Sequence, residues 1–113
     1  MNTVTNAESI LIEEGSDNAY ADLGYPDAEE MQVKAGLAGE IGQIIKRRHL
    51  TQQQAAELLG MPQSKLLGML RGQFRGISQT KMIECLNRLG RDVEIVVKKT
   101  GRRAMGHTHV VFA

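Results

Sequence analysis

The stretch from Gln52 to Leu70, QQQAAELLGMPQSKLLGML, constrains the fold more than any other part of the chain. Two runs of helix-forming residues lie on either side of Gly60. Ala56 is the small residue that a second helix needs where it passes over the first. Gly60, four residues later, permits the left-handed backbone of a tight turn. This spacing predicts two short helices that cross steeply, the arrangement called a helix-turn-helix.

The apolar residues of this stretch predict which side of the two helices is buried. Helical spacing turns one set of side chains inward, namely Ala55, Leu59, Met61, Leu66 and Met69. We expect the second helix to run from about Gln63 to Arg71, with a contrasting face directed outward. That outward face carries Gln63, Ser64, Leu67, Gly68 and Arg71, with Lys65 at its margin.

Such a face has the chemistry to read duplex DNA. Gln63 can pair with adenine through two hydrogen bonds, Arg71 with guanine or a phosphate, and Leu67 can touch a thymine methyl. We expect Gln52 to contact a phosphate, and Lys65, Arg75 and Lys81 to contribute mainly through their charge. The alternative is that these are ordinary polar groups of a protein surface.

Capping residues predict where the helices begin and end. Thr51 is expected to cap the first helix of the motif, and Pro62 and Gly72 to bound the second. In the preceding segment, three glycines are predicted to allow close approach of another helix: Gly36, Gly39 and Gly42.

Two further helices flank the motif. Asp27, with Glu30 three residues on, has the spacing of a capping box and predicts a helix that runs to about Arg48. Ser78 and Gly90 are typical of the start and end of a last helix. The chain is therefore expected to be mainly helical, with four to five helices.

The sequence changes character after that last helix. From Asp92 to Lys98, Val93, Ile95 and Val97 alternate with polar neighbours except at Val96, and His109–Phe112 could form a second short strand. We expect one or two C-terminal β-strands whose open edges contribute to a dimer interface. The predicted division is an N-terminal arm (1–25), a DNA-binding domain (26–91) and C-terminal strands (92–113).

Charge is distributed unevenly along the 113 residues. The formal net charge is +1, yet residues 1–45 carry a net charge of −8 and residues 46–113 carry +9. This polarity suits a C-terminal part that meets a polyanion, although solvated faces of opposite sign would give the same counts. We expect a soluble cytoplasmic protein, since no run of eighteen apolar residues occurs and the single Cys85 fits a buried, inert thiol.

The sequence does not predict an enzyme or a cofactor. No phosphate-binding loop, GxSxG or HExxH motif is present, and the histidines form no evident acid–base or metal set with Cys85. His107 and His109 would share one face of a strand, which leaves a metal site conceivable, but we expect none.

Several segments resemble the Xre-type helix-turn-helix regulators, and among them the HigA-like antitoxins. TQQQAAELLGM is similar to that family's first motif helix and turn, and MLRG followed by LGRDVEIVVKK resembles its continuation. SDNAYADLGYPDAEEMQVKAGLA resembles the upstream segment, so the resemblance covers residues 16–99. It departs from the family at Pro62, where a Ser or Thr cap is usual, and at Leu67 and Gly68, which are commonly polar.

The resemblance implies a lambda-repressor-like fold and a toxin–antitoxin role. A homodimer would bind palindromic half-sites in its own promoter, and the same protein would neutralise a basic, RelE-like mRNA-cleaving toxin. We expect the toxin contact in the acidic N-terminal segment, with Asp17–Asp22 as a further region, and name as its residues Ile10, Leu11, Ile12, Glu13 and Glu14. The alternatives are a stand-alone transcription factor and an interaction module that no longer binds DNA.

Overall fold

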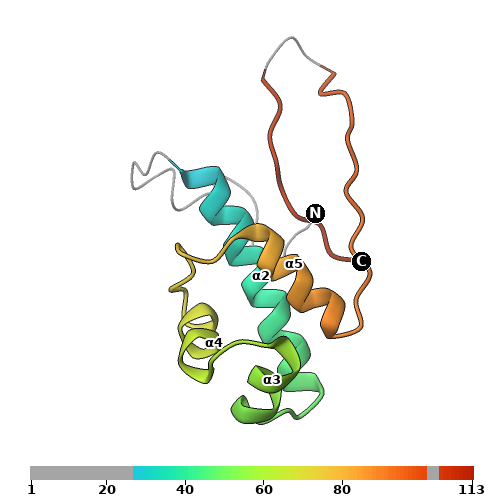
Figure 1. The fold of residues 1–113 in the computed structure, drawn as a ribbon. Coiled ribbons are helices and arrows are strands. Elements are labelled where there is room, and N and C mark those ends of the chain that lie inside the picture. The colour runs from blue at the N-terminus through green and yellow to red at the C-terminus, as the bar shows by residue number, and fades with distance from the viewer. Residues whose placement is uncertain (1–26, 102–104) are drawn as a thin grey trace. The chain divides into compact units, whose positions relative to one another are not determined.

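The computed structural model describes residues 27–101 and 105–113. The described part contains four helices, α2 (Ala28–Arg47), α3 (Gln52–Leu59), α4 (Gln63–Leu70) and α5 (Gln79–Arg88) (Figure 1). The mainly helical prediction is therefore confirmed. The predicted arm of residues 1–25 and the proposed toxin-contact residues lie outside the described residues.

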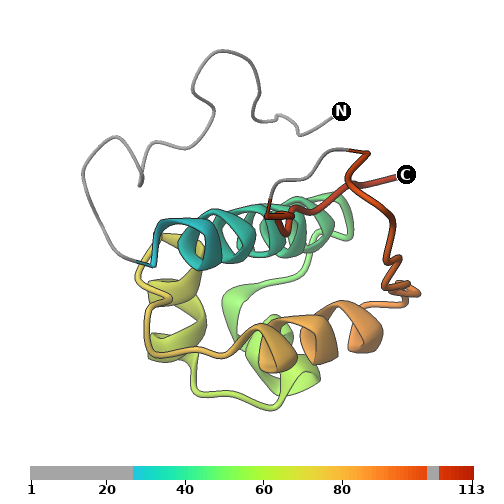
Figure 2. The same cartoon turned by 90° about the horizontal axis from the view of Figure 1, so that it is seen from above.

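The chain divides into two compact units, one of which comprises residues 34–92 and is called the helical unit below. The other unit combines the residues before 34 with those from 93 to 113. Figures 1 and 2 show that α5 runs in the same general direction as α2. No helix in the described part of the chain has the length and apolar character needed to cross a membrane.

The caps predicted at Thr51 and Ser78 are observed at the starts of α3 and α5. At α3, the Gln54 N–H donates to Thr51 Oγ1 (3.1 Å) and the Thr51 N–H donates back to Gln54 Oε1 (2.9 Å), so both halves of a capping box are present. At α5, Ser78 Oγ accepts the Lys81 N–H at 3.0 Å. Asp27 directly precedes α2, and its carbonyl accepts the Met31 N–H at 3.0 Å.

All four helices end in the same way. Two backbone N–H groups just beyond each helix fold back onto carbonyls of its last turn, which brings one residue to a positive φ. These residues are His49 (φ 55°), Gly60 (φ 65°), Gly72 (φ 93°) and Gly90 (φ 87°). Only α2 ends on a residue that carries a Cβ, so His49 adopts a conformation that is costly for its type.

The core of the helical unit lies among the apolar stripes of the helices. Several side chains are completely inaccessible to solvent: Ile41, Ile44, Ala55, Leu59, Met69, Met82 and Cys85. The five residues predicted to face inward around the turn are all buried. Phe74 and Ile77, in the loop between α4 and α5, are buried as well, which the sequence analysis did not predict.

Cys85 is buried on α5, as predicted. Burial raises the pKa of its thiol because the thiolate would lose hydration inside the protein. The inert character expected from the sequence agrees with this environment.

The helical glycines of α2 have different surroundings. A Cβ added at Gly42 would lie 3.4 Å from Leu70 Cδ2, so α4 does approach α2 there. A Cβ at Gly39 would meet nothing within 4 Å. The predicted role in close helix packing therefore holds at Gly42 and is wrong at Gly39.

The C-terminal strands predicted for Asp92–Lys98 and His109–Phe112 are not observed. Residues 92–100 and 105–113 have no regular secondary structure. Ile95 and Val97 are 82% and 91% exposed, and Val93 is 37% exposed. A strand requires a partner strand for its backbone groups, and this part of the chain offers none within the described residues.

The end of the chain contacts the first turn of α2 instead. His107 Nδ1 lies 3.0 Å from Glu29 Oε1, and the Thr108 N–H donates to Glu29 Oε2. The hydrogen bond to His107, followed by that from Thr108, lowers the pKa of the Glu29 carboxyl. A polar contact thus occupies the place where a second strand was expected.

Candidate nucleic-acid interface

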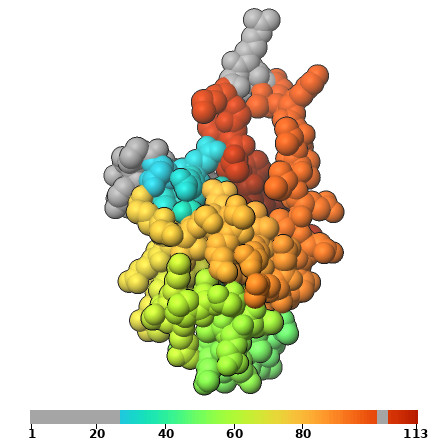
Figure 3. Space-filling model, in the orientation of Figure 1, coloured from blue at the N-terminus to red at the C-terminus, as the bar shows by residue number. Residues whose placement is uncertain are grey.

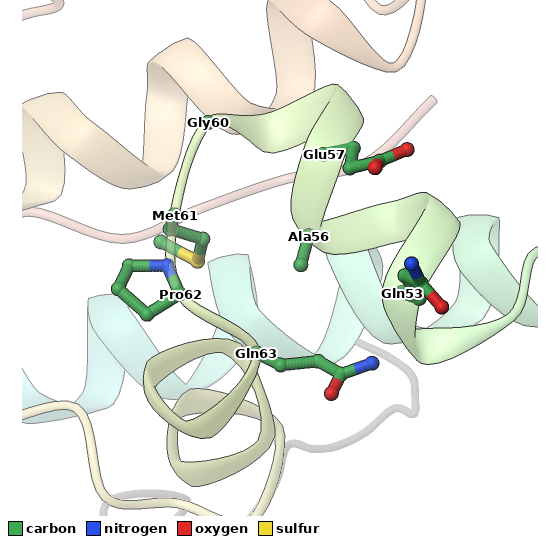
Figure 4. Close-up of a pocket in the computed structure, with 7 residues that line it drawn as sticks. All are labelled: Gln53, Ala56, Glu57, Gly60, Met61, Pro62 and Gln63. Carbon is green, nitrogen blue, oxygen red and sulfur yellow. The ribbon is translucent and has the colours of Figure 1, made fainter.

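The turn between α3 and α4 has the geometry that the sequence predicts. Gly60 adopts φ 65° and ψ 39°, and the Met61 N–H donates to the Ala56 carbonyl at 3.1 Å. Ala56 and Met61 are each only 7% exposed, so the small side chain does lie where the two helices meet. Figure 4 shows the chain turning sharply from Gly60 through Pro62 into α4.

Cationic side chains from α5 hold the C-terminal end of α3. Arg88 Nη1 donates to the Leu58 carbonyl at 3.3 Å, and Lys81 Nζ donates to the Leu59 carbonyl at 3.5 Å. Glu84 binds both cations, at 3.0 Å from Arg88 Nη2 and 3.8 Å from Lys81 Nζ. Since the last turn of α3 has no basic residue of its own, α5 supplies the positive charge that the helix end favours.

The sequence-predicted residues of α4 lie on one side of that helix. Leu66 and Met69 are 1% and 0% exposed and anchor its inner face. The opposite side carries the predicted contact residues, of which Leu67 and Gly68 are half-buried and the others exposed: Gln63, Ser64, Lys65 and Arg71. Figure 3 shows side chains of the α3–turn–α4 segment, in green to yellow-green, on the molecular surface.

The two remaining predicted residues lie on neighbouring segments. Gln52 is exposed at the first position of α3. Arg75 is exposed in the loop after α4, and its carbonyl accepts a hydrogen bond from Lys34 Nζ at 3.2 Å. Because Lys34 is only 3% exposed on α2, this bond ties the loop that carries Arg75 to the body of the helical unit.

An open depression separates the start of α3 from the start of α4, lined by Gln53, Ala56, Glu57, Gly60, Met61, Pro62 and Gln63. In Figure 4 the Gln63 side chain extends from α4 toward the side on which Gln53 lies. The sequence analysis overlooked Gln53. Its spacing could have revealed it, because a residue three positions before Ala56 shares the helix face that meets α4.

The N-terminal turn of α4 has no side-chain cap. Pro62 precedes the helix with φ −61° and ψ 146° and makes no capping hydrogen bond. The backbone N–H groups at a helix N-terminus point outward and favour an anion such as a phosphate. Residues 27–101 and 105–113 contain no group of three or more side chains that could hold a metal ion.

Comparison with known proteins identifies the family. A family model described as "Helix-turn-helix domain" matches residues 19–98. The chain belongs to this helix-turn-helix family. The helix-turn-helix protein is also 40% identical to a solved structure named "Putative XRE Family Transcriptional Regulator", with a TM-score of 0.72 over 78% of this chain and 100% of that chain. The comparison with curated proteins finds no match.

These findings confirm the helix-turn-helix prediction and the likeness to the Xre type. Neither of them names the HigA-like group, a toxin or an oligomeric state. The antitoxin role, the dimer and the individual contact residues therefore remain predictions.

Proposed function

We propose that this helix-turn-helix protein binds duplex DNA with α4 in the major groove and represses transcription. The observation that carries the proposal is the solvent-facing side of α4, held outward by the buried Leu66 and Met69 and by the turn at Gly60. A major groove admits an α-helix whose outer side chains reach the base edges.

Each predicted residue has a role in this complex. Gln63 and Ser64, in the first turn of α4, read base edges, and the uncapped N–H groups beside them bind a backbone phosphate. Arg71 binds guanine or a phosphate, and Leu67 contacts a thymine methyl. Gln52, Lys65 and Arg75 bind the phosphate backbone and set the position of the helix.

Binding as a homodimer follows from the size of one recognition helix. A single helix reads only a few base pairs, so specific affinity requires two half-sites, about 34–36 Å apart for consecutive turns of one DNA face. The exposed apolar side chains of Val93, Ile95 and Val97 support an interface in this segment, formed by pairing with the same segment of a second copy. Analytical ultracentrifugation of a chain that ends at Arg91 tests this, and an undiminished dimer would contradict it.

The DNA-binding proposal is tested by titration with salt. The probes are a duplex taken from immediately upstream of the protein's own reading frame and a scrambled duplex of equal length. If about five Lys or Arg side chains per dimer contact phosphates, log K should fall with log salt at a slope of about −4 to −5. A flat response, or no binding at low salt, leaves the interaction-module alternative.

Two variants show whether α4 is the reading element. Gln63→Ala should weaken binding to the upstream duplex more than binding to the scrambled duplex, because the loss of a base contact lowers sequence preference. Gln43→Ala is the matched control, since Gln43 is an exposed glutamine on α2. Equal behaviour of the two variants would contradict the placement of Gln63 in the groove.

We further propose that the protein is the antitoxin of a toxin–antitoxin pair and represses the promoter of both genes. The support is the resemblance of residues 16–99 to HigA-like antitoxins and the net charge of −8 over residues 1–45, which suits a basic, RNA-cleaving partner. A small basic reading frame beside this gene, and co-purification of its product with the full chain, are expected. A chain without residues 1–25 that still silences the toxin would contradict the contact at Ile10–Glu14.

A further inference from the structure

The loop after α4 places an additional polar side chain against the exposed face of that helix. Gln73 is exposed, and its side chain lies over Gly68. A Cβ added at Gly68 would come within 3.2 Å of Gln73 Oε1 and 3.7 Å of Gln73 Cβ. The absence of a side chain at Gly68 therefore makes the space that the Gln73 side chain occupies.

The backbone fixes this juxtaposition. The Gly72 N–H donates to the Met69 carbonyl at 3.1 Å, and the Gln73 N–H donates to the Gly68 carbonyl at 2.8 Å. This pair of bonds folds the chain back along the last turn of α4, with Gly72 at φ 93°. Gln73 is consequently held beside Gly68 by main-chain hydrogen bonds as well as by the packing of its own side chain.

Gly68 lies on the side of α4 that faces away from the core. At 100° per residue its direction falls between those of Ser64 and Lys65, about 160° from the buried Leu66 and about 100° from the buried Met69. The gap that a glycine leaves on this face is filled by an amide from the loop. The sequence predicts Gly68 as a DNA-contact residue, but the side chain that can form hydrogen bonds at that place is the amide of Gln73.

We propose that Gln73 is a specificity-determining residue that reads a base edge, adenine by the geometry of its amide, and that Gly68 is the positioning residue that seats it. The NH₂ group of a glutamine amide can donate to N7 of adenine in the major groove while its carbonyl oxygen accepts from the N6 amino group. This inference rests on the proposed function, because it requires α4 to lie in that groove.

The test is selection from a randomised duplex library with wild type, Gln73→Ala, Gly68→Ala and the double variant, with Gln43→Ala as control. We expect wild type to select a consensus and Gln73→Ala to lose preference at one position in each half-site. Affinity for the consensus should fall by about 5-fold to 150-fold, the discrimination of one bidentate contact, while affinity for non-consensus duplex is unchanged. Gln43→Ala should retain the complete consensus.

The Gly68→Ala variant tests the positioning role of Gly68 separately from base recognition by Gln73. Its methyl group would lie 3.2 Å from Gln73 Oε1, so the amide must shift from its seat, and we expect a weaker preference at the same position. The double variant should lose no more than Gln73→Ala alone. Thermal unfolding is followed in parallel, and Gly68→Ala should be at least as stable as wild type because alanine favours a helix interior. A further loss in the double variant would show that the methyl itself obstructs DNA and would overturn the seating role.

The selection experiment distinguishes failure of the Gln73 proposal from failure of the proposed DNA-binding function. An unchanged consensus in Gln73→Ala, beside a clear consensus in wild type, overturns the role of Gln73 and leaves the proposed function intact. A wild type that selects no consensus rejects both.

Discussion

The helical unit (residues 34–92) and the segment from residue 93 onward both carry clear apolar periodicity, yet the structure treats them in opposite ways. Ile44, on the stripe of α2, is 0% exposed, whereas Ile95, on the alternating stretch, is 82% exposed. A repeating pattern identifies which side chains share a face. Whether that face is buried depends on a second surface that packs against it. The helices provide such surfaces for one another, whereas the described residues provide none for the alternating stretch.

The largest expected difference in the free energy of unfolding is between an isoleucine-to-alanine substitution in the helical unit and the same substitution in the segment from residue 93 onward. Ile44→Ala removes a fully buried side chain and should lower the free energy of unfolding by about 2–5 kcal/mol. Ile95→Ala should change it by less than about 0.5 kcal/mol in the monomer. Urea unfolding measures both. A cost for Ile95→Ala that grows with protein concentration would show that a second copy covers this segment.

Two glycines with positive φ give the next contrast. Gly60→Ala should destabilise the protein by about 1–2 kcal/mol because alanine resists the left-handed backbone. Its Cβ would also lie 3.1 Å from Arg88 Nη1, which holds the end of α3. Gly101→Ala carries the same kind of backbone strain at φ 77° but meets no neighbour within 4 Å and lies in the exposed segment, so a smaller cost than at Gly60 is expected. Equal costs in thermal unfolding would mean that both segments are equally constrained.

A third prediction concerns the one helix that ends without a glycine. His49→Gly should raise the free energy of unfolding by about 1 kcal/mol, because His49 holds φ 55° against its steric preference. His49→Ala keeps the Cβ and serves as the control, for which no gain is expected. A gain in both variants would locate the effect in the imidazole rather than in the backbone.

The smallest effect concerns the end of the chain and depends on pH. The folded pKa of Glu29 lies below its ordinary 4.5, so its bonds to His107 and Thr108 are present above that pH and are lost as the pH falls through the lowered value. The amide chemical shift of Thr108 should follow this titration, while the helical circular dichroism signal stays constant. Glu29→Gln should abolish the titration of the Thr108 shift. A signal that titrates equally in Glu29→Gln would assign the change to another group.

The sequence predicts the helical motif well because its determinants are local. Thr51 and Gln54 lie within one helical turn of each other, and Gly60 determines its own backbone conformation. Burial of Leu59, Leu66 and Met69 follows from helical periodicity alone. The exposed face of α4 follows in turn, since a helix with one buried side must present the other.

Contacts between residues distant in sequence could not be predicted in this way. Lys34 binds the carbonyl of Arg75, and Arg88 binds that of Leu58, across separations of 41 and 30 residues. Gln73 is near Gly68 in sequence, but its position depends on how the chain folds back after α4. The strand prediction at Val93–Val97 is not confirmed for the same reason, since alternation describes one chain and a ladder requires two.

The sequence by itself therefore determined the helices, the caps at Thr51 and Ser78, the turn at Gly60 and the outward face of α4, because each depends on residues within about one or two helical turns of one another. Tertiary structure alone decided that α5 secures the end of α3 and that Lys34 fixes the loop carrying Arg75. These depend on where separate backbones meet in space, and that is set by the packing of the whole core.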